Sequence, residues 1–158
     1  MFKGFEPVYT LNSEVLILGS FPSVKSRQYG FYYGNKQNRF WKMLEGVFNE
    51  NISDDIESKK EFLIKHNIAL FDIVSESDLK GSADYSLVKS SHRTSDISML
   101  LPPFTSVKKI LCNGKMAYDI LMKNYTLKIP VICMPSTSPA NVSYNYSLWE
   151  KELEFLVK

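Results

Sequence analysis

The chain of 158 residues is long enough for one domain with a sizeable core, and its 44% of hydrophobic residues is ordinary for a globular protein. A net charge of only +2 at pH 7 excludes a uniformly basic surface, so a polyanionic partner would have to bind a local positive patch. The sequence shows no signal peptide and no membrane-spanning stretch, and we therefore expect a cytoplasmic protein without a membrane partner.

Four short apolar runs are predicted as strands, at residues 14–19, 67–74, 107–114 and 130–135. None of them alternates cleanly between apolar and polar residues, which is typical of strands buried on both faces of a parallel sheet. Helical patterns fall at 38–48, 53–66, 114–124 and 147–158, with Ser53 and Ser147 as expected N-caps. This alternation of strands and helices predicts an α/β sandwich around a central, mainly parallel sheet.

The segment after the first strand, residues 19–41, is both positive and aromatic. It contains Lys25, Arg27, Lys36 and Arg39, and no Asp or Glu occurs between Glu14 and Glu45. Its aromatic residues are Phe21, Tyr29, Phe31, Tyr32, Tyr33, Phe40 and Trp41. Cations suit phosphates and aromatic rings suit the stacking of bases, so this segment predicts binding of nucleic acid.

Two other segments follow the carboxyl ends of predicted strands, where α/β sheets bind their ligands. Residues 75–95 are polar, lack a clear period and are expected to form a long loop. His92 and Arg93 in that loop are candidates for a phosphate contact. The third segment, residues 135–147, reads as a turn-rich connection that would lie near the first segment.

Several chemistries are missing from the sequence. It has no P-loop, no G-x-G-x-x-G motif and no G-x-S-x-G nucleophile elbow. Cys112 and Cys133 lack the spacing of a redox or zinc motif, and we expect both to be buried, reduced thiols on adjacent strands. We therefore expect neither a metal nor a cofactor.

Two motifs together resemble the uracil-DNA glycosylase superfamily, and within it the hypoxanthine-DNA glycosylases, also called DNA-deoxyinosine glycosylases. The first is "LILGSFPSVKSRQYGFYYGNKQNRFWKML", and the second is "STSPAN" at residues 136–141. The segments "LFDIV", "GSADYS" and "NGKMAYDIL" follow in the order of the family. The resemblance implies a three-layer α/β/α fold with a four-stranded sheet, formed by a single glycosylase domain over residues 1–158.

The resemblance also implies an activity, which is hydrolysis of the N-glycosidic bond of a deaminated base to leave an abasic site. Such an enzyme must take the nucleotide out of the helix and hold the base in a pocket. Tyr33 corresponds to the aromatic platform of the family, with a core tyrosine as the alternative. Gly19, Ser20 and Phe21 of "GSFP" would line the same pocket, whereas Phe31 and Trp41 are expected in the core.

Phe21 is the main departure from the superfamily, whose members commonly carry a water-activating Asn or Asp third in "G-x-[ND]-P". A phenyl ring cannot activate water, and the hypoxanthine branch resembles this chain in that substitution. The resemblance then places the catalytic amide at Asn38, where it would orient water or bond the leaving base. The alternative is that Asn38 only caps the helix that follows it.

The second motif departs as well. Its fifth position, often a large residue that fills the space of the flipped nucleotide, is Ala140, so Val142 or Tyr144 is the candidate wedge. Ser136 stands where relatives use His or Asn against the base. Further DNA contacts are expected from six residues of the two motif segments: Lys25, Arg27, Lys36, Arg39, Ser138 and Asn141.

The sequence thus predicts a monomeric, monofunctional glycosylase whose partner is DNA containing a deaminated base, most simply deoxyinosine. Lys25 as a Schiff-base nucleophile stays open. The alternatives are a non-catalytic module that binds single-stranded or damaged nucleic acid, a uracil- or mismatch-type glycosylase, and a small-nucleotide-binding α/β module. The last of these would have to manage without a phosphate loop.

Overall fold

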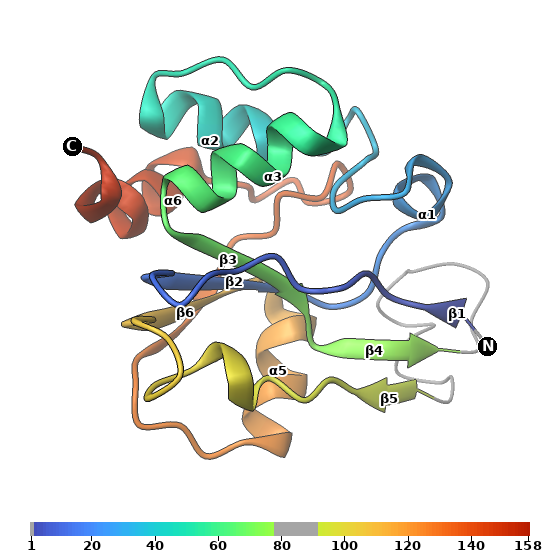
Figure 1. The fold of residues 1–158 in the computed structure, drawn as a ribbon. Coiled ribbons are helices and arrows are strands. Elements are labelled where there is room, and N and C mark those ends of the chain that lie inside the picture. The colour runs from blue at the N-terminus through green and yellow to red at the C-terminus, as the bar shows by residue number, and fades with distance from the viewer. Residues whose placement is uncertain (1, 78–91) are drawn as a thin grey trace.

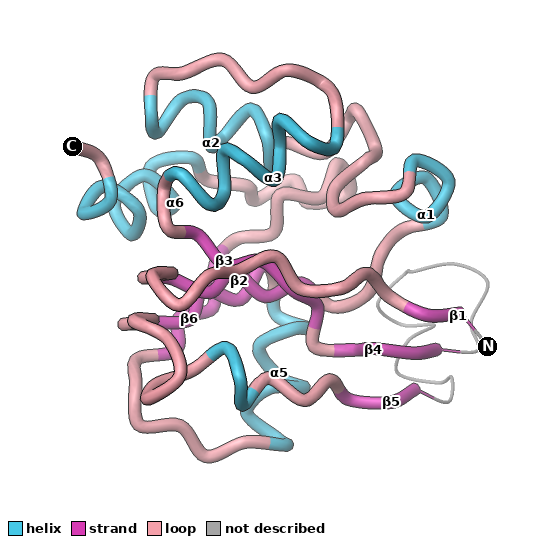
Figure 2. Tube along the Cα trace, viewed as in Figure 1, coloured by secondary structure: helices cyan, strands magenta, loops and turns pink. Residues whose placement is uncertain are grey.

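The protein was analysed as a computed structural model that describes residues 2–77 and 92–158. Its centre is a four-stranded parallel sheet in the order β3-β2-β6-β7 (Figures 1 and 2). The strands are β2 (Val15–Gly19), β3 (Ile68–Asp72), β6 (Lys109–Asn113) and β7 (Val131–Met134). All four coincide with the predicted strands, and their parallel pairing confirms the predicted sheet.

Helices cover both faces of this sheet and complete the predicted three layers. Figure 1 shows α2, α3 and α6 on one face and α5 on the other. Their bounds, with the short α1 and two 3-10 turns, are α1 (Val24–Tyr29), α2 (Phe40–Phe48), α3 (Ile56–Lys65), η1 (Ser98–Leu100), α5 (Lys115–Asn124), α6 (Tyr146–Leu153) and η2 (Glu154–Leu156).

The central strand β2 shows why these segments do not alternate in polarity. Val15 and Ile17 point into the core beneath α2, α3 and α6, whereas Leu16 and Leu18 point into the core beneath α5. All four side chains are completely buried. A strand that packs against helices on both faces needs apolar residues at every position, as the sequence predicted.

A small antiparallel sheet lies beside the main one, in the order β1-β4-β5 (Figure 2). It comprises β1 (Phe2–Lys3), β4 (Val74–Ser77) and β5 (His92–Thr94). The prediction of one loop over residues 75–95 is therefore wrong at both ends of that range, where the chain forms β4 and β5. The strands form because β4 continues directly from β3 and pairs through backbone groups, which polar residues do not prevent. Residues 78–91 lie outside the described ranges.

Three smaller predictions were also wrong. Helix α3 is capped by Asp55, whose carboxylate accepts a hydrogen bond from the Ser58 N–H at 2.9 Å, and not by Ser53. Helix α6 is capped by Asn145, because the helix begins before Ser147. Cys112 is buried, but Cys133 is exposed because β7 is an edge strand.

Candidate active site

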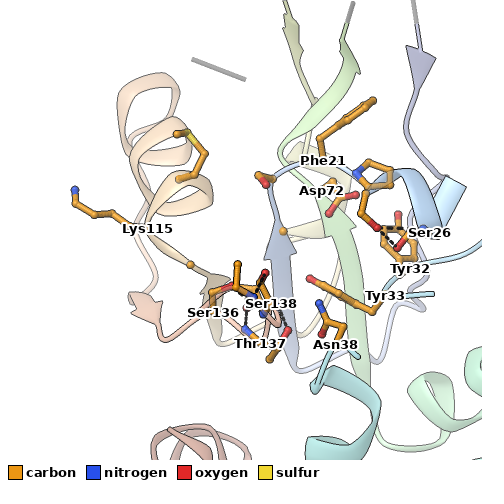
Figure 3. Close-up of a pocket in the computed structure, with 18 residues that line it drawn as sticks. Phe21, Ser26, Tyr32, Tyr33, Asn38, Asp72, Lys115, Ser136, Thr137 and Ser138 are labelled. Atoms are coloured by element: carbon orange, nitrogen blue, oxygen red, sulfur yellow. Dashed lines mark hydrogen bonds between the residues drawn. The ribbon is translucent and has the colours of Figure 1, made fainter. Parts of the chain in front are cut away.

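A cavity of about 410 Å³ lies beyond the carboxyl ends of β2, β3 and β6, where α/β sheets bind ligands. Residues from both sequence motifs line it (Figure 3). Its lining residues are Gly19, Ser20, Phe21, Pro22, Ser23, Ser26, Tyr32, Tyr33, Asn38, Asp72, Asn113, Gly114, Lys115, Met116, Ser136, Thr137, Ser138 and Ala140. The structure thus brings together all the predicted substrate-binding residues and Asn38, although they come from segments a hundred residues apart.

Tyr33 presents its ring to this cavity from a fixed backbone. It stacks on Phe40 with ring centroids 4.1 Å apart, and its φ of 53° is unusual for a bulky residue. The neighbouring residues hold this conformation from both sides. The Trp41 indole N–H donates to the Tyr32 carbonyl at 3.1 Å, and the Gly34 N–H donates to the Ser26 hydroxyl at 3.0 Å. The ring is therefore both part of the core and a wall of the cavity.

Gly19 and Asp72 form the floor of the cavity beside Tyr33. They are partners in the β2–β3 register. A Cβ on residue 19 would lie 2.5 Å from Asp72 Oδ1 and 2.9 Å from the Tyr33 hydroxyl oxygen. Only glycine leaves space for both side chains at this point.

Two polar atoms at this floor have no hydrogen bond within the described part of the chain. They are the hydroxyl of Tyr33 and Oδ2 of Asp72, and both are buried. Burial raises the pKa of Asp72 from its ordinary value to about 7. Burial, and then the nearby Asp72, raise the pKa of Tyr33 far above its ordinary value, and the Asn113 amide opposes that rise because it lies near the Tyr33 hydroxyl, although its hydrogen bonds of good geometry go to Thr137. Burial thus favours the neutral form of both the carboxyl and the phenol at this floor.

Asn38 uses the oxygen of its amide to bind the start of α2 and leaves the NH₂ group for the cavity. Its Oδ1 accepts a hydrogen bond from the N–H of Phe40, the first residue of α2, at 2.9 Å. The same hydrogen bond fixes which end of the amide is oxygen. In Figure 3 the side chain lies on the same side of the cavity as Tyr33. The N-cap of α2 is Arg39, so Asn38 is not the cap itself: it binds the first N–H of the helix from the preceding position, and this hydrogen bond also orients its NH₂ group.

Asn113 ends β6 and fastens the second motif to the sheet. Its Oδ1 accepts from the Thr137 N–H at 2.9 Å, and its NH₂ group donates to the Thr137 hydroxyl at 3.0 Å. Thr137 is completely buried. This pair of hydrogen bonds positions Ser136 and Ser138 on the cavity wall.

Arg39 fastens the same loop to the first motif. Its Nε–H donates to the Thr137 carbonyl at 3.4 Å, and its Nη2 donates to the carbonyls of Ser138 and Asn141. The guanidinium carbon lies 4.3 Å from the centre of the Tyr144 ring. Arg39 was predicted to contact DNA, but the donors described here are directed at protein carbonyls.

The polar side chains of the second loop mainly shape the loop itself. Ser136 and Ser138 accept hydrogen bonds from the N–H groups of Ser138 and Ala140. Asn141 donates to the Ser136 carbonyl and accepts from Ser143. Val142, by contrast, is 99% exposed, so it is the large apolar side chain that this loop presents to solvent.

The remaining predicted cations, Lys25, Arg27 and Lys36, do not line the cavity. Lys25 on α1 and Lys36 are exposed, and the Arg27 guanidinium carbon lies 5.7 Å from the centre of the Phe21 ring. A second hollow of about 340 Å³ lies next to Tyr33 and Asn38, with Lys36, Lys42 and Lys59 in its wall. Phe21 itself is buried, 6% exposed, and supplies an apolar surface.

Sequence reasoning missed Asp72, Asn113 and Lys115 as cavity residues. The signal was present for the first two, because each is a polar residue that ends an apolar strand. Within residues 2–77 and 92–158, no three His, Cys, Asp or Glu side chains group closely enough to hold a metal ion. In the same ranges no helix is long and apolar enough to cross a membrane.

Comparison with known proteins gives one consistent result. The family model of the uracil DNA glycosylase superfamily matches residues 6–157. A curated relative from Methanosarcina acetivorans, named hypoxanthine DNA glycosylase, is 34% identical over 154 residues, covering 94% of this chain and 95% of the relative. A second of the same name, from Methanosarcina barkeri, is 31% identical and covers 88% and 87% of the two chains.

A solved structure agrees with these matches. It is a solution NMR structure from Methanosarcina acetivorans, of a protein described provisionally as a uracil DNA glycosylase. It superposes with a TM-score of 0.82 at 32% identity, over 98% of this chain and 97% of the other.

Proposed function

The chain belongs to the uracil DNA glycosylase superfamily, as its two motifs predicted, and we propose that it excises hypoxanthine from DNA containing deoxyinosine. The reaction is hydrolysis of the N-glycosidic bond, which leaves an abasic site. The two hypoxanthine DNA glycosylases align with this chain over nearly their whole length, which supports the choice of base.

The observation that carries the proposal is the cavity between the two motifs. It opens at the sheet edge where ligands bind, has an aromatic ring in its wall and has unpaired polar atoms at its floor. A base inserted there would find a face to stack on and groups to bond. The volume of about 410 Å³ lies within the range of sites for small ligands.

Base capture would use the ring of Tyr33 and the tip of the second loop. Stacking of a base on an aromatic face contributes about 1–3 kcal/mol. Of the two candidate wedges, Val142 is favoured by its exposure of 99%, whereas the ring of Tyr144 lies against Arg39. Ala140 is too short for this role. Insertion of an apolar wedge offsets part of the cost of taking the nucleotide out of the stack.

Bond cleavage would depend on stabilisation of the departing base, because Phe21 cannot activate water. Negative charge builds on the base as the N-glycosidic bond breaks, and the sugar becomes oxocarbenium-like before water attacks it. The NH₂ group of Asn38, oriented by the hydrogen bond to the start of α2, would donate to the base as this charge develops. One positioned donor of this kind contributes about 10²–10³ in rate.

Strand cleavage at abasic sites tests the proposal. Labelled duplexes with one deoxyinosine, deoxyuridine or deoxyxanthosine are incubated with the protein and then treated with alkali. We expect cleavage at deoxyinosine that requires the alkali step. Cleavage at deoxyuridine alone would show that the substrate base is uracil and not hypoxanthine. Cleavage without alkali would indicate a lysine nucleophile such as Lys25. Binding without cleavage would indicate a non-catalytic module.

A further inference from the structure

Lys59 on α3 is a buried cation that the mechanism above does not use. It is only 5% exposed, and it lines the second hollow but not the cavity between the two motifs. Lysine is almost never buried to this extent unless it is paired. Its ammonium donates to Asp54 Oδ1 at 3.0 Å and to the Tyr29 hydroxyl at 3.2 Å. A buried lysine contributes little net stability, because the cost of taking its charge out of water offsets the attraction of its partner. Stability alone therefore does not account for this side chain.

The Lys59 ammonium also lies against two aromatic rings. It is 4.5 Å from the centre of the Tyr29 ring and 5.2 Å from the centre of the Trp41 ring, and both distances are within the range of cation–π attraction. Tyr29 is the last residue of α1, and Trp41 is in the first turn of α2. One side chain of α3 thus ties the end of α1 to the start of α2.

The same two rings hold the segment that carries Tyr33. Tyr29 packs so closely on Gly34 that a Cβ at residue 34 would lie 2.6 Å from the Tyr29 Cβ. The Trp41 indole N–H donates to the Tyr32 carbonyl at 3.1 Å. The residues before and after Tyr33 are therefore each held by a ring next to the ammonium. Tyr33 itself has a φ of 53°, a conformation that a bulky residue keeps only where its surroundings impose it.

We propose that Lys59 is a positioning residue that holds the ring of Tyr33 in the orientation in which a base can stack on it. The inference rests on the proposed function and adds to it a residue that touches neither the base nor the sugar. Lys59 acts through Tyr29 and Trp41. Loss of its charge leaves the lining of the cavity complete but allows Tyr33 to relax from its strained conformation, and a displacement of about 1 Å in a preorganised site can cost about 100-fold in rate.

The first test compares Lys59→Met with Lys65→Met. Methionine keeps an unbranched chain and removes the ammonium, and the partner Asp54 is exposed, so the variant leaves no unpaired charge in the interior. Lys65 is the matched control, because it lies on the same helix and pairs with Glu50 at the same distance of 3.0 Å, but is exposed.

The two variants should differ in rate and not in affinity. At saturating duplex, single-turnover excision of hypoxanthine should fall about 10- to 100-fold in Lys59→Met and stay near the wild-type rate in Lys65→Met. Each variant loses one positive charge, and both should bind an undamaged duplex equally tightly. Excision by Lys59→Met at the wild-type rate would contradict the inference.

Hydrogen exchange at the indole N–H groups reports on position without turnover. The chain has two tryptophans, Trp41 and Trp149, whose indole N–H groups donate to different backbone carbonyls, 3.1 and 2.8 Å away. Lys59→Met should speed exchange about tenfold or more at the Trp41 indole and at the Gly34 amide, and leave Trp149 unchanged. Lys65→Met should change none of these rates. Equal acceleration at both indoles, with earlier melting, would show that Lys59 only stabilises the fold.

Tyr29→Phe provides a milder second variant. It removes the hydroxyl that accepts from Lys59 and keeps the ring that packs on Gly34. It should slow excision less than Lys59→Met does. The double variant should be slowed by less than the product of the two separate effects, because both substitutions remove the same hydrogen bond. Effects that multiply fully would contradict an action of Lys59 through Tyr29.

These readouts separate the two proposals. Wild type that releases no hypoxanthine from DNA would contradict the proposed function, and the exchange rates would still decide whether Lys59 holds the segment around Tyr33. Wild type that releases hypoxanthine, together with a Lys59→Met variant that has wild-type excision and wild-type exchange, would contradict the role of Lys59 alone.

Discussion

Gly19 and Asp72 face one another at the ends of β2 and β3, and the missing side chain of the first makes room for the carboxyl of the second. A Cβ at residue 19 would lie 2.5 Å from Asp72 Oδ1, which is closer than real Cβ contacts. The floor of the cavity therefore exists in this form only because the "GSFP" motif begins with glycine.

Replacement of Gly19 by alanine should damage the site more than the fold. The added methyl must displace Asp72 or Tyr33, and overpacking of this kind costs about 1–3 kcal/mol of stability. We expect excision of hypoxanthine to fall about 100-fold or more, because a displaced group in a preorganised site costs that much. Gly4→Ala is the matched control, since its new Cβ would meet only ordinary contacts from 3.4 Å outwards. A Gly19→Ala protein with wild-type activity would contradict the described floor.

Tyr33 can be tested by separating its ring from its hydroxyl. Tyr33→Phe keeps the face that stacks and removes a buried hydroxyl without a described partner, so stability should hold or rise by about 1 kcal/mol. Tyr33→Ala should weaken base capture by about 1–3 kcal/mol, measured as affinity for a duplex with deoxyinosine relative to an undamaged duplex. If Tyr33→Ala mainly lowers the melting temperature and spares this affinity difference, the ring is core and not platform.

Lys25 and Lys36 should contribute to affinity without affecting base choice. Both are exposed, and Lys36 lines the hollow next to Tyr33. Each alanine variant should reduce the slope of log affinity against log salt by about 0.9 if the lysine contacts one phosphate. Lys123→Ala, on the exposed end of α5, removes the same charge and should leave the slope unchanged. If all three variants show the same slope of log affinity against log salt, Lys25 and Lys36 do not contact phosphates and the DNA binds elsewhere.

Arg39 should behave as a loop clamp and not as a phosphate contact. Its guanidinium donates to three loop carbonyls, a geometry that the single ammonium of lysine cannot reproduce. Arg39→Lys should therefore slow excision about as much as Arg39→Ala, and both should speed hydrogen exchange at the amide of Asn141, which donates to the Ser138 carbonyl. A phosphate contact gives the opposite pattern, in which lysine preserves DNA affinity and the exchange rate does not change.

Much of the fold could be predicted because its signals are local. A run such as residues 14–19 is apolar at every position, and only a strand covered on both faces requires that pattern. The small sheet could not be predicted in this way, since β4 and β5 are polar and pair through their backbones. The caps of α3 and α6 were mispredicted because several suitable residues stand side by side there, and the sequence does not show which one precedes the first turn.

Site residues that lie within one sequence motif could be predicted. Site residues whose roles depend on their neighbours in the folded structure could not. Tyr33 and Asn38 line the cavity as the motif indicated. Asn113 and Asp72 end strands that the sequence located, but their roles depend on what lies next to them in space. Arg39 and Asn141 were predicted as DNA contacts from charge and polarity, whereas the hydrogen bonds described here are made within the protein.

Asn38 offers the sharpest separation of chemistry from stability. Asn38→Asp keeps an oxygen that can accept from the Phe40 N–H, but it removes the NH₂ donor. Asn38→Ala removes both and should cost about 1 kcal/mol of stability through the lost hydrogen bond to the start of α2. The pair thus isolates the half of the amide that the mechanism uses.

The decisive measurement is the single-turnover release of hypoxanthine from a duplex with one deoxyinosine, followed by mass spectrometry of the free base. Wild type should release hypoxanthine in proportion to enzyme, and both Asn38→Asp and Asn38→Ala should be slower by about 10²–10³ while only the alanine variant melts earlier. Release by Asn38→Asp at nearly the wild-type rate, or by neither wild type nor variant, would contradict the account of this cavity as a hypoxanthine-excising site.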